Sequence, residues 1–269
     1  MNLSFKLITK AKALVEHQQQ IFSLFEECFA KPLCERLWQW AFLENPCGEP
    51  IVSLCFNDEN KLVGHYAVIP LILRNKNGVV NSCLSMTTMV HSHYRLYGVF
   101  ADQAHQVYEE AKKRGVQLVI GFPNTNSAPG FKKRLGWTIN ESDYMACVEK
   151  QQLVKSSDFK KICEDPDLLD LDIHDKRYRQ WRLSKPGVEY LDRGEVILKK
   201  FERQYDLVYV GKGFAESLRE GEQYNILIDG AVQDFRKSFL FGYPLGYKMM
   251  GDNMINPAFK RNMLMSDVF

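Results

Sequence analysis

The chain has 269 residues, of which 45% are hydrophobic and 25% are charged, and its formal net charge is +2. This composition is typical of a globular protein with one large or two small domains, and the near-neutral charge gives no reason to expect a nucleic-acid partner or a membrane surface. No stretch approaches the ~20 apolar residues of a membrane span, and the N-terminus lacks the hydrophobic region of a signal peptide.

The first half of the chain predicts alternating helices and strands. Residues 13–29 carry apolar side chains at helical spacing and predict an amphipathic helix. Residues 50–73 predict two strands joined by a turn at Asn57–Asn60. The elements predicted after these are, in order, a strand at 81–92, a helix at Ala101–Arg114, an apolar strand at 116–122, a short helix ending at Gly136 and a strand near Tyr144–Val148.

A polar, acidic stretch divides the chain near its middle. Residues 151–175 predict a connector between a first lobe, residues 1–150, and a second lobe, residues 176–269. Apolar runs in the second lobe predict further strands. A weak internal repeat favours a duplicated lobe, because three residues recur 141 positions later: Arg36, Gln39 and Trp40 as Arg177, Gln180 and Trp181.

The seven cysteines are scattered along the chain without a C-x-x-C pair. This spacing fits neither a disulfide framework nor a metal site. Small buried thiols in a reducing compartment are the simpler interpretation, so we expect a cytoplasmic protein without a bound metal.

The turn after the third predicted strand has the features of a phosphate site. The run R-L-Y-G-V-F, from Arg95 to Phe100, joins a strand to a helix with one glycine and no proline. Backbone N–H groups of such a turn, and of the first turn of the helix, can bind a pyrophosphate together with the positive end of the helix dipole. Gly98 would allow close approach and Arg95 would add fixed charge. An ordinary strand-to-helix turn is the alternative interpretation.

Residues 90–137 resemble the GNAT superfamily of coenzyme A-dependent N-acyltransferases. Four features occur in the family's order: the strand end and turn from Val90 to Phe100, the helix after it, the asparagines Asn124 and Asn126, and the short helix of "FKKRLGW" that closes on Gly136. The resemblance covers about residues 50–150 and implies an α/β fold with a mixed sheet, in two GNAT-like lobes with a central cleft. It implies that acyl-CoA, as a co-substrate, contacts Met89, Val90, Arg95, Leu96, Tyr97, Gly98, Val99, Phe100, Asn124, Asn126 and Phe131.

Two residues depart from the family pattern. Phe100 stands where the family usually has Gly or Ala, so we expect its side chain to turn into the core while its N–H faces the phosphate. Lys132 stands where many members have a tyrosine general acid, and a lysine could either stabilise a thiolate or point to solvent.

The resemblance also implies that a backbone N–H near Met89 or Val90 binds the developing oxyanion. A base is needed to deprotonate the amine. Its candidates, each with a structural role as the alternative, are His65, His91, His93 and Asp143.

The acceptor is the amine that would receive the acyl group. The chain resembles two-lobed N-acyltransferases that act on nucleotide-linked amino sugars, such as a dTDP-linked 3-amino-3,6-dideoxyhexose, for O-antigen (lipopolysaccharide) or capsule synthesis. This implies transfer of an acetyl or 3-hydroxybutyryl group, with acceptor contacts predicted from the second lobe at Arg179, Trp181, Arg182 and Tyr243. Core packing is the alternative role of Trp181. The alternative functions are an N-acyltransferase of an amino acid, a peptide or a cell-wall precursor, and a non-catalytic coenzyme A-binding or interaction module. The oligomeric state stays open.

Overall fold

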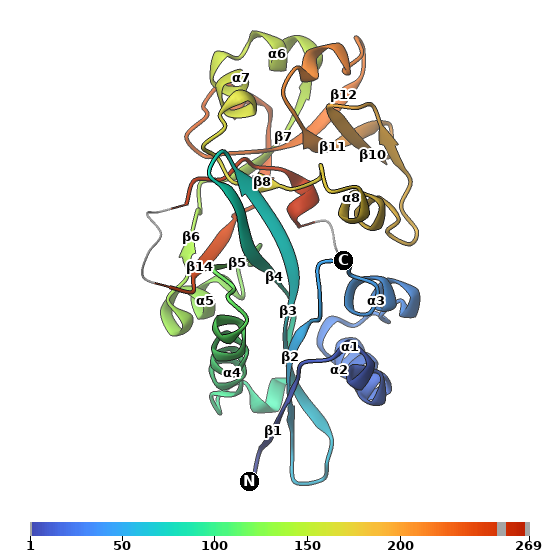
Figure 1. The fold of residues 1–269 in the computed structure, drawn as a ribbon, viewed down its shortest axis with the longest axis vertical. Coiled ribbons are helices and arrows are strands. Elements are labelled where there is room, and N and C mark those ends of the chain that lie inside the picture. The colour runs from blue at the N-terminus through green and yellow to red at the C-terminus, as the bar shows by residue number, and fades with distance from the viewer. Residues whose placement is uncertain (1, 252–256, 267–269) are drawn as a thin grey trace.

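The computed structural model describes residues 2–251 and 257–266, which form two mixed β-sheets with helices on their faces (Figure 1). The first sheet has the order β1-β2-β3-β4-β5-β14-β6, with β8 also paired to β3: β1 (Ser4–Ile8), β2 (Ile51–Phe56), β3 (Leu62–Asn75), β4 (Gly78–Val90), β5 (Leu118–Gly121), β6 (Thr138–Ile139), β8 (Asp170–Leu171) and β14 (Gly246–Met249). The second has the order β13-β7-β12-β11-β10-β9: β7 (Tyr144–Glu149), β9 (Tyr190–Asp192), β10 (Val196–Phe201), β11 (Gln204–Val210), β12 (Gln223–Ile228) and β13 (Phe239–Gly242).

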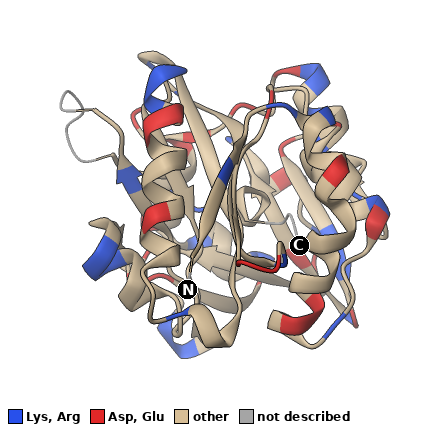
Figure 2. Cartoon of the chain, turned by 90° about the horizontal axis from the view of Figure 1, so that it is seen from below, with Lys and Arg blue, Asp and Glu red and all other residues tan. Residues whose placement is uncertain are grey.

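The helices lie on the faces of these sheets. They are α1 (Ala11–Leu14), α2 (Gln18–Phe29), α3 (Glu35–Phe42), α4 (Val99–Lys113), α5 (Ala128–Leu135), α6 (Lys150–Lys155), α7 (Ser157–Glu164) and α8 (Lys176–Leu183). The helix predicted at 13–29 is interrupted by a 3-10 turn, Val15–His17, and the predicted connector contains α6, α7 and β8. Basic and acidic segments are interspersed over the helices, as the small net charge suggests (Figure 2).

Among the described residues, no helix is both long and apolar enough to cross a lipid bilayer.

The first sheet is covered on both faces. On one face α4 and α5 pack through Ala104, Val107, Tyr108, Ala111 and Phe131. On the other face lie α2 and α3 (Figure 1). Successive strand residues point to opposite faces, which explains why β2 and β5 are buried along their whole length.

The two halves of the chain exchange a strand. β14, from the C-terminal half, lies between β5 and β6 of the first sheet, with Gly246 opposite both Gly121 and Ile139. β7, from the N-terminal half, lies between β12 and β13 of the second sheet. The predicted boundary near residue 150 therefore does not separate the two sheets, because the first sheet takes β8 and β14 from beyond it and the second takes β7 from before it. Local periodicity identified both segments as strands but carries no information about their long-range partners.

The repeated tryptophans join the two halves. The rings of Trp40 on α3 and Trp181 on α8 stack with centroids 4.7 Å apart and an interplanar angle of 15°. Each indole N–H donates to the backbone carbonyl of the other residue, at 2.8 and 2.9 Å. Each tryptophan thus makes the same hydrogen bond to the other, as two residues related by a local two-fold axis do. The two residues that recur 141 positions apart are therefore in direct contact.

Candidate active site

An opening between β4 and β5 forms the candidate site. These parallel strands are paired from Ser82 and Leu118 to Leu84 and Ile120, and beyond that point they diverge. Two neighbouring cavities of about 210 and 450 Å³ occupy the opening; we call them the inner and the outer cavity. Both are lined by Phe29, Thr88, Asn124, Ser127 and Phe131, so they form one continuous site.

A β-bulge shapes the β4 wall of this opening. The register between β3 and β4 shifts between His65, which faces Met89, and Ala67, which faces Met86. Thr87 in the bulge adopts a left-handed conformation with φ 47°, which is strained for a β-branched residue. The Thr87 carbonyl lies 2.8 Å from His65 Nδ1. Because a carbonyl only accepts, Nδ1 carries the proton, and His65 holds the bulge in place.

His65 is a structural residue rather than the predicted base. It is fully buried, and its Nε2 has no hydrogen-bond partner among the described residues. Burial lowers its pKa to about 4, against which the hydrogen bond to Thr87 acts only partly. His65 is therefore neutral at physiological pH and out of reach of a substrate.

We expect His65 to make stability depend on pH. Its pKa is about 6.5 in the unfolded chain and about 4 in the folded one. Between these values the unfolded chain binds more protons, so the free energy of unfolding should fall by about 3 kcal/mol as pH drops through that window. Denaturant unfolding at both ends of the window should show a shallower fall for His65→Gln. The exposed His105→Gln should behave as wild type, and an unchanged slope in His65→Gln would contradict the assignment.

The predicted phosphate turn lies at the outer end of the opening. Gly98 has φ 78°, in the left-handed region, and precedes α4 as its N-cap without any side-chain capping bond. The first N–H groups of α4, at Val99 and Phe100, have no acceptor within the helix. A Cβ built on Gly98 would meet only open space apart from the Asp102 carboxylate at 3.7 Å. The turn therefore leaves room for an anion.

Arg95 and Phe100 complete this end of the site. Arg95 lines the outer cavity, and its Nε donates to the Val90 carbonyl at 3.2 Å, which ties the turn to the end of β4. Phe100 packs edge-on against Phe131 at 5.1 Å, so its side chain is turned toward the core as expected. The residues fit a pyrophosphate, because the Arg95 charge offsets that of Asp102 at the same helix end.

Other predicted cofactor contacts divide between the cavity and the surface. Met89, Val90, Asn124, Asn126 and Phe131 line the outer cavity. The Asn124 side chain accepts from the N–H groups of Asn126 and Ser127, so its carbonyl oxygen is used in the turn. Leu96 and Tyr97 are exposed at the tip of the phosphate turn, and neither lines the cavity.

The remaining acid or base candidates lie outside the two cavities: His91, His93, Lys132 and Asp143. The Lys132 ammonium is exposed and donates to Glu141 at 2.8 Å. Asp143 is buried, accepts from the Gly230 and Leu245 N–H groups and pairs with Arg261 at 2.8 Å. Lys132 therefore points to solvent, which is one of the two alternatives for it, and Asp143 is not placed as a base, because it fastens the C-terminal segment to the start of β7.

The predicted acceptor residues are placed apart from the cavities. Trp181 and Arg182 are 8% and 2% exposed, and the Arg182 guanidinium lies 5.4 Å from the Trp40 ring centroid. They pack the contact between lobes and are unavailable to a ligand. Arg179 is paired with Asp192 at 2.6 Å. Tyr243 stacks on Phe122, which lines the inner cavity, with ring centroids 5.3 Å apart.

Sequence reasoning missed much of the cavity lining. Cys28 and Phe29 reach the outer cavity from the end of α2. Ser85, Thr87, Thr88, Phe122 and Trp137 line the inner cavity from β4, from the end of β5 and from the segment before β6. These residues face a cavity because β4 and β5 stop pairing next to them. No local pattern in the sequence shows where that pairing ends.

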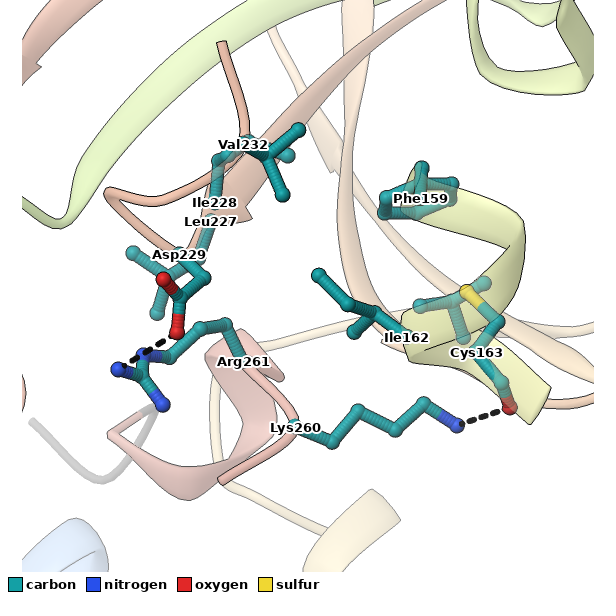
Figure 3. A pocket seen from close by; sticks show the side chains of 10 residues that line it. Phe159, Ile162, Cys163, Leu227, Ile228, Asp229, Val232, Lys260 and Arg261 are labelled. Carbon is teal, nitrogen blue, oxygen red and sulfur yellow. Dashed lines mark hydrogen bonds and ion pairs between the residues drawn. The ribbon is translucent and has the colours of Figure 1, made fainter. Parts of the chain in front are cut away.

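The equivalent place in the second sheet is filled. β11 and β12 are also parallel and pair only at Tyr205 with Tyr224 and at Asp206 with Asn225. Beside their diverging ends lies the C-terminal segment, whose Asn262 accepts from the Val210 N–H at 3.1 Å. Figure 3 shows Arg261 reaching Asp229 and Lys260 reaching the Cys163 carbonyl. The cavity left there is about 10 Å³, which suits at most a single water.

Comparison with known proteins finds a family model that matches part of the chain. Residues 12–140 match the family model described as acetyltransferase (GNAT) domain. A comparison with curated proteins finds no match.

Solved structures are similar over nearly the whole chain. A GCN5-related N-acetyltransferase from Anabaena variabilis is 12% identical with a TM-score of 0.62, covering 92% of this chain and 73% of its own. One from Kribbella flavida is 10% identical with a TM-score of 0.60, covering 92% and 72%. A tandem GNAT protein from the clavulanic acid biosynthesis pathway is 10% identical with a TM-score of 0.54, covering 94% and 100%. The chain therefore has the GNAT fold, and its residues 12–140 match the acetyltransferase domain of that family.

Proposed function

We propose that this chain is an N-acyltransferase that uses acyl-CoA as its acyl donor. One observation carries the proposal: an uncapped helix N-terminus, a left-handed glycine and an arginine stand together at the outer end of a cavity between two diverging parallel strands. Gly98, the first N–H groups of α4 and Arg95 would hold the pyrophosphate. The outer and inner cavities would hold the pantetheine arm and the acyl group.

The thioester of such a donor supplies an acyl carbonyl and a thiolate leaving group. The residues of this chain contribute orientation and hydrogen-bond donors. The bulge at Thr87 interrupts the β3–β4 ladder, and the bulged residue of such a motif is left unpaired. The register resumes with Met89 opposite His65, so Thr88 has no β3 partner, and its backbone N–H would be free to face the carbonyl oxygen as it gains charge.

The described cavity lining offers no general base. Its ionisable side chains are Cys28 and Arg95, and burial raises the pKa of the Cys28 thiol. The amine must therefore lose its proton to water before it attacks. Activity would then rise with pH until the acceptor amine is deprotonated.

For the acceptor, we propose an amine carried by a bulky ring system, such as a nucleotide-linked amino sugar. The wall of the inner cavity supports this, because Phe122 and Tyr243 stack beside it and Tyr243 meets the half-exposed Phe241 at 6.3 Å between ring centroids. Aromatic faces in such a row can stack on a base or pack against a sugar. Acetyl and 3-hydroxybutyryl are the proposed acyl groups.

Coenzyme A binding tests the proposal. Calorimetry should detect saturable binding to the wild-type chain, and Arg95→Ala should weaken it about 5- to 100-fold, the range of one charge-assisted hydrogen bond. Arg134→Ala, which removes an exposed arginine from α5, is the matched control and should bind as wild type. Thiol release from acyl-CoA with a panel of amines then tests transfer. A wild-type chain that binds no coenzyme A would defeat the proposed function.

A further inference from the structure

An indole ring stands at the inner end of the opening between β4 and β5. Trp137 is 3% exposed and lines the inner cavity, but not the outer cavity, whose wall includes Arg95. A Cβ built on Gly121 would lie 3.2 Å from Trp137 Cζ3 and Cη2 and 3.5 Å from the Ser85 carbonyl oxygen. Gly121 and Ser85 are the first residues beyond the last paired residues of β5 and β4. The benzo ring of Trp137 therefore lies where the two strands begin to diverge.

Two glycines on adjacent strands make the slot that holds this ring. Gly121 of β5 and Gly246 of β14 are paired directly with each other. A Cβ on Gly246 would lie only 3.1 Å from Trp137 Cε3, so the ring fits because both strands lack a side chain there. Because β14 comes from the C-terminal half of the chain, the strand exchange builds one side of the slot.

Two further contacts fix the orientation of the ring. Trp137 Nε1 donates to Tyr108 Oη at 2.8 Å, and the Phe131 ring packs edge-on against the indole with centroids 4.7 Å apart. Tyr108 is itself buried, so turning the indole would leave its N–H and the tyrosine hydroxyl without this hydrogen bond inside the core, which costs free energy. The indole is therefore a rigid wall of the inner cavity.

The position of this wall limits the group that the inner cavity can hold. The phosphate turn lies at the outer end of the opening and Trp137 at the inner end, so a donor held at the turn would extend its acyl group toward the indole. The inner cavity has a volume of about 210 Å³, and a buried cavity of about 150 Å³ holds benzene, so there is room for an acyl chain of up to about six carbons.

We propose that Trp137 is a specificity-determining residue that limits the acyl donor to short chains. The inference rests on the proposed function and names the class of acyl group that its site accepts. Acetyl and 3-hydroxybutyryl groups fall within this class. A longer chain would have to push the indole out of its glycine slot and break the hydrogen bond to Tyr108.

The binding of butyryl-CoA and octanoyl-CoA tests this inference without turnover. Calorimetry gives the ratio of the two affinities for each protein. Trp137→Phe replaces the indole by a smaller ring and should raise the octanoyl-to-butyryl affinity ratio about 15-fold over wild type. This is the gain expected from room for two more methylenes at about 0.8 kcal/mol each.

Gly246→Ala should change the same ratio in the opposite direction. Gly246 lines neither cavity, so its new Cβ would crowd the indole from the β14 side. The remaining neighbours of the ring are buried, and it can give way only toward the cavity. The octanoyl-to-butyryl ratio should fall at least about fourfold, the value of one methylene. This variant keeps all the residues of the cavity wall and carries the test if Trp137→Phe does not fold.

Trp38→Phe is the matched control, because Trp38 is a fully buried tryptophan of α3 that lines neither cavity. It should lower stability but leave the affinity ratio as in wild type, which separates a loss of packing from a change of the cavity. An affinity ratio equal to that of wild type in the folded variants of Trp137 and Gly246, with all proteins binding coenzyme A, would overturn the role of Trp137 alone. A wild-type chain that binds no coenzyme A would instead overturn the proposed function and this inference with it.

Discussion

Replacing Trp181 by alanine should lower the free energy of unfolding by about 3–5 kcal/mol, the loss typical of a buried tryptophan. The change removes the ring stacked on Trp40, and it leaves the Trp40 carbonyl without its indole donor. Because the contact joins α3 and α8, the loss should appear as a lower midpoint of one cooperative transition. Denaturant unfolding followed by circular dichroism measures it.

A double-mutant cycle with Trp40→Ala sharpens this prediction. Residues in contact should show a coupling energy of about 0.5–3 kcal/mol. Leu96→Ala, at a side chain that is 92% exposed, provides the surface control and should change stability little. Coenzyme A affinity should be unchanged in every stable variant. If the Trp181→Ala protein is stable but has a raised KM for the acceptor, Trp181 contacts the acceptor and is not a core residue.

Replacing Gly98 by valine should reduce coenzyme A affinity about 100-fold, which is about 3 kcal/mol and equals the loss of one or two charge-assisted hydrogen bonds. The new side chain would fill the open space over the first N–H groups of α4. Its branched Cβ would also disfavour the backbone, which has φ 78°. Calorimetric titration with coenzyme A measures the effect.

Gly115→Val separates obstruction from backbone strain. Gly115 has φ 71° just beyond the other end of α4 and likewise has open space around it. Both variants should lose stability through the same strain, but only Gly98→Val should lose coenzyme A affinity. Equal affinity in the two variants would show that the turn does not bind the pyrophosphate.

The local elements of the first lobe were predictable from the sequence. The buried face of α4, the strands on either side of the turn at Asn57–Asn60 and the stop at Gly136 all follow from side-chain spacing and backbone preference. The turn before α4 was predictable for the same reason, because the residues from Arg95 to Phe100 are contiguous in the chain, and its binding of phosphate stays a prediction. Phe100 was also placed correctly, since only its N–H is needed at the helix end.

The catalytic and acceptor candidates were not predictable in this way. His65 sits on a strand beside the site, but only the bulge at Thr87 shows that its ring supports the backbone from inside the core. Trp181 belongs to a repeated motif, but only the packing of α8 on α3 shows that the two repeated tryptophans touch each other. Whether a side chain is buried depends on its contacts with residues far away in the chain. The spacing of residues within one segment does not reveal those contacts.

The sequence by itself determined the strands and helices of the first lobe and the place of the glycine turn before α4, because these depend on neighbouring residues. The tertiary structure alone decided that β7 and β14 exchange sheets, that the C-terminal segment fills the second opening and that Trp137 lines the first one. Each of these depends on pairing or packing between residues distant in the chain. Such contacts form because the whole fold must pair its buried backbone N–H and C=O groups and bury its apolar surface.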